Sequence, residues 1–571
     1  MSLDMSNAFN SISRDKILTN IRKYLPQLET FFLWAYGNPS NLCDRDGNFI
    51  CHSSQGIKQG DPLGPLLFSL GIHDTLLAAH FKFRDIQLLA YMDDIYLFGH
   101  LDTIKIAAQE IIDSLLKHGL SFNNNKTVIF NIKDPPTQNV NNKGLKLLGI
   151  PIGTDDYIKK EATNIFSSLT KILNLISKLD SIHAIKLLRF CISARPTYFL
   201  RCIHHTLSLD SSVKFDQEVH DCLLKILHSP EELLTQYQKN IIHLPIKLGG
   251  LGLRSAELTR EEAFRASFFE CLRYIENYIP RLYCFTRSSL NNFPATYTEF
   301  SQKELTISKN ITILNQTESL LSDSPNLKHL FLSGKSKETH SWILNPVSSD
   351  KIFKLSDEEY SSATRLKLLF PAQPQLDTPC SCGKINVNDP FHFLNCNKAS
   401  LVITARHNAI RDRLCKFIHN CNIGQTPIIE QKIAGTNLIC DIIAKTNANC
   451  NDFIDVCIVN PAANTYINKV AMDIRDKFKD RKYRKALKDS KIIYNIVPFI
   501  LELTGRLHSN ARDYIFKLGK IGSGFKYPKS SKILRNILIH DLNVILTKFN
   551  AQLVNNGYFY TQNIRISPNN C

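Results

Sequence analysis

The chain has 571 residues, which is too many for one hydrophobic core and predicts several domains. Its composition, 43% hydrophobic and 21% charged, excludes an intrinsically disordered protein. Lysine and arginine outnumber aspartate and glutamate by 69 to 52, and a net charge of +17 indicates a polyanionic partner, either nucleic acid or an anionic membrane surface.

The sequence has neither a long apolar run typical of a membrane-spanning helix nor the basic-then-apolar start of a secretory signal. We therefore expect no membrane contact and a location in the nucleus or the cytoplasm. The sixteen cysteines are expected to be free thiols or metal ligands. A protein of the membrane surface is disfavoured because no clear amphipathic anchor is present.

The N-terminal segment places Asp4 directly after what looks like the end of a strand. A helix is expected next, with Ser13 as its N-cap and an apolar stripe that includes Ile17 and Ile21. This helix should stop at Pro26, because proline disrupts a helix interior.

A glycine-bearing segment, residues 55–62, precedes a second predicted helix. Asp61 is expected to cap it, with Pro62 at its first position. One face should be buried, because apolar residues recur at helical spacing: Leu63, Leu66, Leu67 and Leu70. Glycine at the start of such a helix permits the close approach of a nucleotide.

Two short apolar runs flank Asp93 and Asp94 and predict a β-hairpin with both acids at its tip. Adjacent carboxylates repel each other, so such a pair favours a bound cation. An ordinary solvated turn is the alternative, and these residues alone leave both open.

Three motifs in order, Asp-x4-Phe at residues 4–9, Gln-Gly-Asp-Pro at 59–62 and Tyr-Met-Asp-Asp at 91–94, resemble the palm of a reverse transcriptase, particularly those of non-LTR retrotransposons. The resemblance continues through roughly residue 270. It includes the family's next motif, its primer-contacting hairpin and a segment that follows the thumb: residues 119–127, 147–150 and 243–253.

The resemblance implies a polymerase site in which Asp4 and Asp93 bind two Mg²⁺ ions and Asp94 supports them. Phe9 would lie under the incoming sugar and favour deoxynucleotides, although a plain core phenylalanine is the alternative. The nucleotide pocket would include three further residues: Gln59, Gly60 and Lys126, the last either assisting the leaving phosphate or merely solvated.

The family also carries a fingers region before its first aspartate, whereas three residues precede Asp4 here. We therefore expect a fragment of a longer reading frame or a decayed copy. A catalytically inactive, nucleic-acid-binding relic is the alternative to a polymerase.

A Cys-x-Cys-x9-His-x3-Cys pattern places Cys380, Cys382, His392 and Cys396 at spacings that suit a tetrahedral Zn²⁺ site. The gap in the first pair is tighter than usual, and unrelated cysteines are the alternative. The pattern resembles the knuckle between polymerase and nuclease in retrotransposons that carry a restriction-like endonuclease.

Beyond this pattern, two strand-like runs carry Asp441 and Asp455, and a basic helix-like stretch follows over residues 473–488. Lys479 and Lys482 share a face of that helix. A plain α/β domain with solvated acids is one interpretation.

The same region also resembles the restriction-like endonuclease of those retrotransposons. The resemblance implies that Asp441 and Asp455 bind Mg²⁺ and that Lys479 or Lys482 steadies the attacking water. The family's Arg-His-Asn motif matches three consecutive residues: Arg406, His407 and Asn408.

Together these features predict an α+β multidomain protein: a right-hand palm, a helical thumb, a small zinc knuckle and an α/β nuclease. The predicted segments are a partial palm (1–133), the thumb and post-thumb segment (134–270), a helical connector (271–375), the knuckle (376–400), the nuclease (401–530) and a tail (531–571). The predicted function is RNA-directed DNA polymerisation with DNA nicking for target-primed reverse transcription. Its partners would be an RNA template, a DNA primer or target, and deoxynucleotides.

Overall fold

The computed structural model describes the chain outside residues 124, 132–139, 279–300, 371–381, 383–390, 422–425, 448–449, 467–468, 489–492, 526–529 and 556–571. It forms two compact units, Met1–Asn164 and Ile165–Cys571. None of the helices within the described ranges is long and apolar enough to cross a bilayer.

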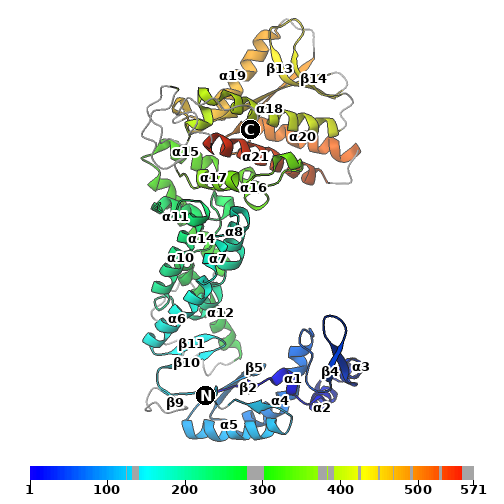
Figure 1. The fold of residues 1–571 in the computed structure, drawn as a ribbon, viewed down its shortest axis with the longest axis vertical. Coiled ribbons are helices and arrows are strands. Elements are labelled where there is room, and N and C mark those ends of the chain that lie inside the picture. Colours follow the sequence, from blue (N-terminus) through cyan, green and yellow to red (C-terminus); the bar gives the residue numbers. More distant parts are fainter. Residues whose placement is uncertain are drawn as a thin grey trace. The chain divides into compact units, whose positions relative to one another are not determined.

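The first unit is built around a small antiparallel sheet in the order β1-β6-β5, with α2, α4 and α5 packed around a shared core (Figure 1, blue). Strand residues Leu3, Ile95 and Leu97 are fully buried in that core. Its elements are β1 (Ser2–Leu3), β2 (Met5–Ser6), α1 (Ala8–Ser11), α2 (Arg14–Tyr24), α3 (Glu29–Tyr36), β3 (Ser40–Cys43), β4 (Phe49–Ser53), α4 (Gly64–Lys82), β5 (Gln87–Tyr91), β6 (Asp94–Phe98), α5 (Leu101–Leu116), β7 (Ser121–Phe122), β8 (Ile129–Phe130), β9 (Val140–Asn141), β10 (Gly144–Leu147) and β11 (Ile150–Gly153).

The first predicted helix is confirmed as α2. The Ser13 side chain accepts a hydrogen bond from the Lys16 N–H, as an N-cap does, and Ile17 and Ile21 are fully buried. The helix ends at Tyr24, before Pro26.

The second helix differs from its prediction. α4 begins at Gly64 rather than at Pro62, because the Asp61 carboxylate accepts from the Leu63 N–H within a turn. Leu66, which was expected on the buried face, is 41% exposed. The predicted hairpin is confirmed as β5 and β6, but only Asp93 lies in its turn, because Asp94 pairs with Tyr91 as the first residue of β6.

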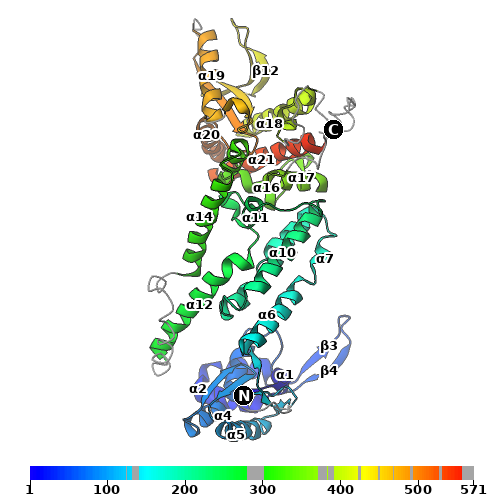
Figure 2. The same ribbon diagram turned by 90° about the vertical axis from the view of Figure 1, so that its left-hand side faces the viewer.

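The second unit begins with a helical layer in which α12 packs against α9, α10 and α14 (Figure 2). Its helices are α7 (Leu173–Ile176), α8 (Ser181–Leu187), the π-helical turn η2 (Leu188–Ile192), α9 (Thr197–Cys202), α10 (Leu209–Ile226), α11 (Gln236–His243), α12 (Ala256–Tyr278), α14 (Gln302–Leu320), α15 (Pro325–Ser333), α16 (Ser341–Leu344) and α17 (Asp357–Lys367). The helix α6 (Asp155–Thr170) contains the boundary between the two units.

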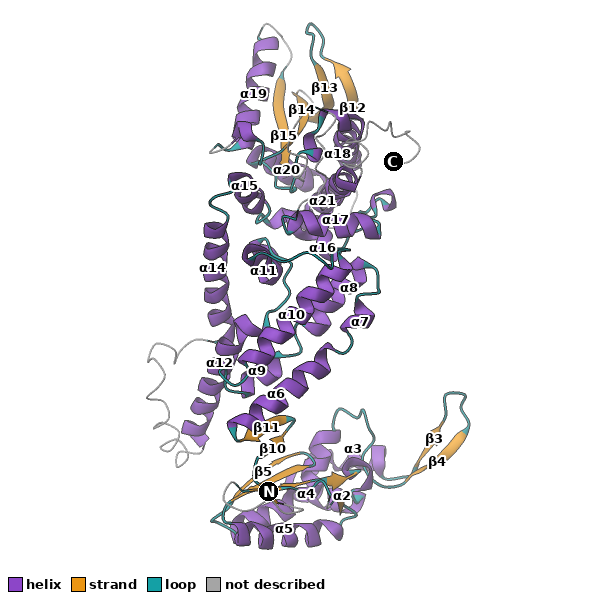
Figure 3. Ribbon diagram, turned by 60° about the vertical axis from the view of Figure 1, so that its left-hand side comes forward, coloured by secondary structure: helices purple, strands orange, loops and turns teal. Residues whose placement is uncertain are grey.

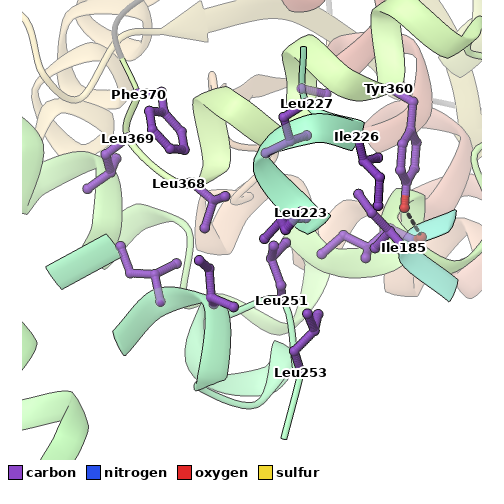
Figure 4. Packing of buried hydrophobic residues seen from close by; sticks show 14 of the residues in the cluster. Ile185, Leu223, Ile226, Leu227, Leu251, Leu253, Tyr360, Leu368, Leu369 and Phe370 are labelled. Carbon is purple, nitrogen blue, oxygen red and sulfur yellow. Dashed lines mark hydrogen bonds between the residues drawn. The ribbon is translucent and has the colours of Figure 1, made fainter. Parts of the chain in front are cut away.

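One hydrophobic core joins distant parts of this unit. Leu223 of α10 and Leu227, directly after that helix, contribute to it together with Leu251 and with Leu368, directly after α17 (Figure 4). The Tyr360 hydroxyl donates a hydrogen bond to the Ile343 carbonyl at 2.6 Å. The predicted thumb and connector segments thus share one core, and their exact boundaries stay a prediction.

The last part of the chain folds around a four-stranded sheet in the order β12-β13-β14-β15 (Figure 3). The first three strands are antiparallel, and β15 runs parallel to β14 after the crossover through α19. The elements are α18 (Ser400–Asn420), β12 (Ile428–Lys432), β13 (Ile439–Asn447), β14 (Cys450–Val459), α19 (Ala471–Ala486), β15 (Tyr494–Glu502), α20 (Ser509–Phe525) and α21 (Ser531–Asn555).

The side chains of β14 alternate between two environments. Ile454 and Val456 pack in the core formed with α18, α20 and α21, whereas Phe453 packs in a smaller cluster with Tyr483 of α19. Since successive strand residues point to opposite faces, Asp455 shares the face of Phe453. The strand pattern therefore turns this carboxylate toward α19.

Candidate functional site

Asp4 lies where the chain passes from one sheet to another. Leu3 pairs with Ile95 of β6, whereas Met5 pairs with Phe122 of β7. The Asp4 carbonyl accepts a hydrogen bond from the Asn123 N–H at 2.8 Å. Backbone pairing on both sides thus fixes the position of this aspartate.

The hairpin brings the other two acids to the same place. Tyr91 pairs with Asp94, so Met92 and Asp93 form a two-residue turn, with Met92 at a φ of 55°. Since Leu3 faces Ile95, the next residue of the N-terminal segment, Asp4, comes beside Asp94. The fold therefore brings the three predicted acids together.

The electrostatics of the tip agree with this proximity. The pKa of Asp94 is raised by partial burial and then by the negative charges of Asp93 and Asp4. The carboxylate oxygens of the three acids do not all lie within 4.8 Å of one another. Across the described ranges, the group of potential metal ligands that meets this distance is Cys382, His392 and Cys396.

The predicted nucleotide-binding residues occupy several places in the first unit. The Lys126 ammonium lies 3.9 Å from the Asp4 carboxylate and is largely exposed. Phe9 is half-buried and stacks on Phe68 of α4, with ring centroids 4.5 Å apart. Gln59 and Gly60 form an exposed turn before α4, and Gly60 has a φ of 90°, which favours glycine.

Two residues that the sequence does not single out, Arg14 and Tyr36, hold this turn region. Arg14 donates hydrogen bonds to the carbonyls of Gly56, at 2.9 Å, and Ser53, at 3.0 Å. The Tyr36 hydroxyl donates to the Asp61 carboxylate, and burial is the main cause that raises the Tyr36 pKa to about 12. No local signal marks these residues, because their partners lie 25 to 42 positions away.

The segment expected to form a primer-contacting hairpin is a hairpin, β10 and β11, joined by Leu148 and Gly149. Both turn residues have positive φ angles, of 48° and 81°, as this tight turn requires. The Leu148 N–H donates to the Tyr96 hydroxyl at 3.1 Å, and Tyr96 lies on β6 two residues beyond Asp94. One strand thus carries an acid of the tip and a contact to the hairpin.

A second group of acids lies in the C-terminal sheet. Asp441 on β13 accepts a hydrogen bond from the Val456 N–H at 2.7 Å, beside Asp455 on β14. The Lys479 ammonium of α19 donates to the Asp455 carboxylate at 2.7 Å, and His407 of α18 lies 3.4 Å from Asp441. Four of the predicted nuclease residues therefore converge.

The charged groups of this cluster shift one another's pKa values. Burial raises the pKa of Asp455, and the neighbouring Asp441 adds to the increase while Lys479 opposes it. Burial raises the pKa of Asp441, but the hydrogen bond from His407 opposes this effect, and the pKa of Asp441 lies below its usual value. The pKa of His407 is raised, mainly by that same hydrogen bond.

The geometry distinguishes the two candidate lysines. The Lys479 side chain is 18% exposed and is paired with Asp455, whereas Lys482 is exposed and lies over the Tyr483 ring at 6.0 Å. Tyr483 is fully buried, and its hydroxyl lies near Cys440 and Asp455. The pKa of Tyr483 is raised, first by burial and then by Asp455.

The Arg-His-Asn motif is divided by the fold. Arg406 is 2% exposed and points away from the acids, donating to the Asn550 side chain at 2.8 Å and to the Leu394 carbonyl at 3.3 Å. It joins α18 to α21, which is a packing role that the motif does not indicate. Asn408 lies 3.4 Å from the other ring nitrogen of His407, so it can orient that ring.

Three of the four predicted zinc ligands come together. Cys382, His392 and Cys396 offer ligand atoms within 4.8 Å of one another, and the Cys382 Sγ lies 3.3 Å from the His392 Nε2. His392 and Cys396 are buried. Cys380, the fourth predicted ligand, lies outside the described residues. Two thiols and an imidazole are a donor set that zinc prefers.

Comparison with known proteins places the polymerase-like motifs in a family. Residues 1–152 match the family described as reverse transcriptase (RNA-dependent DNA polymerase). The chain is 25% identical to the retrotransposable element SLACS 132 kDa protein of Trypanosoma brucei gambiense, over 46% of this chain and 23% of that protein.

Two further relatives are Pol polyproteins of retrotransposable elements. The chain is 30% identical to that of R2DM from Drosophila melanogaster, over 24% of this chain and 14% of the relative. It is 36% identical to the Pol polyprotein of R2 from Nasonia vitripennis, over 12% of this chain and 7% of the relative. The matched segments thus span less than a quarter of each relative. The comparisons thus show that residues 1–152 are similar to reverse transcriptases and that these relatives are proteins of retrotransposable elements.

Proposed function

We propose that the first unit carries an RNA-directed DNA polymerase site in which Asp4 and Asp93 hold Mg²⁺ and Asp94 supports them. The residues fit the metal: mutual repulsion contributes to the raised pKa of Asp94, and carboxylate oxygens are the ligands that Mg²⁺ prefers. When bound, the metal ions would lower the pKa of the primer hydroxyl and neutralise the leaving pyrophosphate.

The neighbouring residues have roles that their positions support. Phe9, stacked on Phe68, would present a rigid surface to the sugar of a deoxynucleotide. Lys126 lies beside Asp4, where its charge would assist the leaving phosphate. Gln59 and Gly60 would border the nucleotide, because their exposed turn leaves the backbone accessible.

The convergence of Asp4 with Asp93 and Asp94 at the hairpin tip carries this proposal. Its test is primer extension on an RNA template with Mg²⁺, using the full chain and its Asp93→Asn variant. We expect a loss of about 10³-fold or more, since metal binding supplies several kcal/mol to such a reaction. Asp85→Asn, an exposed acid just before β5, is the matched control and should retain activity. Equal extension by both variants would refute the ligand assignment.

A catalytically inactive relic is the alternative, and the comparisons do not favour it. If the chain is such a relic, the unmodified chain should bind RNA but should not extend the primer. Asp93→Asn should then bind RNA equally well. Extension by the unmodified chain would eliminate it.

We infer a second activity, DNA nicking, from the C-terminal cluster. Asp441 and Asp455 would hold Mg²⁺, and Lys479 would position the attacking water while His407 orients Asp441. Nicking of a supercoiled plasmid by the full chain should be lost in Asp455→Asn and Lys479→Met but kept in Lys482→Met. Nicking that survives in Asp455→Asn would refute the site.

In this proposal Cys380, Cys382, His392 and Cys396 bind a structural Zn²⁺ beside the nuclease. The whole would nick a DNA target and copy an RNA template from the freed end, within the nucleus or the cytoplasm. The net charge of +17 supports such polyanionic partners.

A further inference from the structure

A cleft in the helical part of the second unit is lined by more cations than its acids neutralise. Its lining includes three cations: Arg189 of η2, Arg254 just before α12, and Lys309 of α14. It also includes one acid, Glu262 of α12. Lys309 lies 3.4 Å from Glu262, so that pair neutralises itself, and the two arginines are left as the charge of the cleft.

Arg189 is held in an unusual way. Its Nη1 atom is buried without a hydrogen-bond partner, and within the described part of the chain no carboxylate lies within ion-pairing distance of it. The guanidinium lies over the Phe190 ring at 4.9 Å. Partial burial lowers the pKa of Arg189, and the nearby Tyr360 opposes this shift.

Two features of the backbone make room for this side chain. Arg189 lies in the π-helical turn Leu188–Ile192, a local distortion that often occurs at functional sites. Against its guanidinium lies Gly252, which has a φ of 75°, and a Cβ there would lie 3.0 Å from the Arg189 Nε. Glycine at this position therefore leaves the space that the guanidinium occupies.

We propose that this cleft binds a backbone phosphate of a nucleic-acid strand, with Arg189 and Arg254 as its cationic contacts. A planar guanidinium donates two parallel hydrogen bonds to phosphate oxygens, and Thr306 and Asn310 add polar groups to the same cleft. The inference rests on the proposed function in one respect, because it takes the strand to be one that the polymerase uses.

The test measures binding of a short fluorescein-labelled single-stranded RNA to the full chain by anisotropy, over a series of salt concentrations. Arg189→Gln should weaken binding about tenfold, since one charge-assisted contact is lost. The slope of log affinity against log salt should fall by about 0.7. Arg254→Gln, at an exposed position where folding is not at risk, should act in the same direction.

Arg195→Gln is the matched control, because Arg195 is exposed, lies outside the cleft and undergoes the same chemical change. If Arg189→Gln and Arg254→Gln bind RNA as tightly as this control, the inference is refuted and the polymerase proposal stands. If the unmodified chain binds no RNA, both fail.

Competition with inorganic phosphate tests whether the cleft binds free phosphate or the phosphate of a nucleic-acid strand. We expect phosphate to compete weakly with RNA for the unmodified chain and not to alter residual binding by Arg189→Gln. Calorimetric phosphate binding that Arg189→Gln abolishes, without any change in RNA affinity, would overturn the assignment to a nucleic-acid strand.

Discussion

The ion pair between Lys479 and Asp455 gives the sharpest prediction for the C-terminal site. Their side chains are 18% and 8% exposed, and the ammonium lies 2.7 Å from the carboxylate. Lys479→Met keeps the length of the side chain but leaves Asp455 beside Asp441 without its cation. Breaking a fully buried pair costs 3–5 kcal/mol, so this partly exposed one should cost about 2 kcal/mol at neutral pH.

The cost should depend on pH with a defined sign. Burial already raises the pKa of Asp455, and Lys479→Met removes the charge that opposes this increase. When a carboxyl has a higher pKa in the folded than in the unfolded state, the folded protein loses stability as the pH rises from the unfolded-state pKa to the folded-state pKa. The variant should therefore lose most stability above the raised pKa and recover as the pH falls toward the unfolded-state value.

Hydrogen–deuterium exchange of the β14 peptides, measured against denaturant, would give the local opening free energy. Lys482→Met is the control, and because Lys482 is exposed it should change stability by less than about 0.5 kcal/mol. Adding Asp455→Asn to Lys479→Met should restore most of the loss. Equal effects of the two lysine variants, or no coupling in the double variant, would refute the assignment of Lys479.

Three further predictions concern other parts of the chain. Cys396→Ser should reduce the zinc measured by mass spectrometry, whereas Cys415→Ser, at another buried cysteine, should not; equal zinc contents would contradict the knuckle. Arg406→Met should destabilise the packing of α18 on α21 by about 2 kcal/mol, because it leaves Asn550 without its donor, and unchanged exchange of α21 would contradict this role. Gly149→Val should loosen the β10–β11 hairpin by about 1–2 kcal/mol, because a φ of 81° is strained for a β-branched residue, and undisturbed protection of these strands would contradict it.

The sequence predicts best where local chemistry decides. The cap at Ser13 and the spacing of Ile17 and Ile21 predict α2 correctly, since a helix needs only near neighbours. The tip at Asp93 is predicted for the same reason, because two strand-like runs around two acids leave little choice but a hairpin.

Tertiary contacts decide what the sequence leaves open. Lys479 and Lys482 share a predicted helix face, and only the position of β14 shows which of them meets Asp455. Arg406 belongs to a catalytic-looking motif, yet its partner Asn550 lies 144 residues away on α21. The Asp61 carboxylate, which was expected only to cap α4, also accepts a hydrogen bond from Tyr36, 25 residues earlier.

We propose that Asp4, Asp93 and Asp94 hold one metal site between them. The most direct test replaces Mg²⁺ by Fe²⁺ and maps the peptide bonds that metal-generated hydroxyl radicals cut. The account predicts cuts in both segments, near residue 4 and near residues 92–95, and their joint loss in Asp93→Asn. Cuts in one segment alone, or cuts in both that survive this substitution, would contradict it.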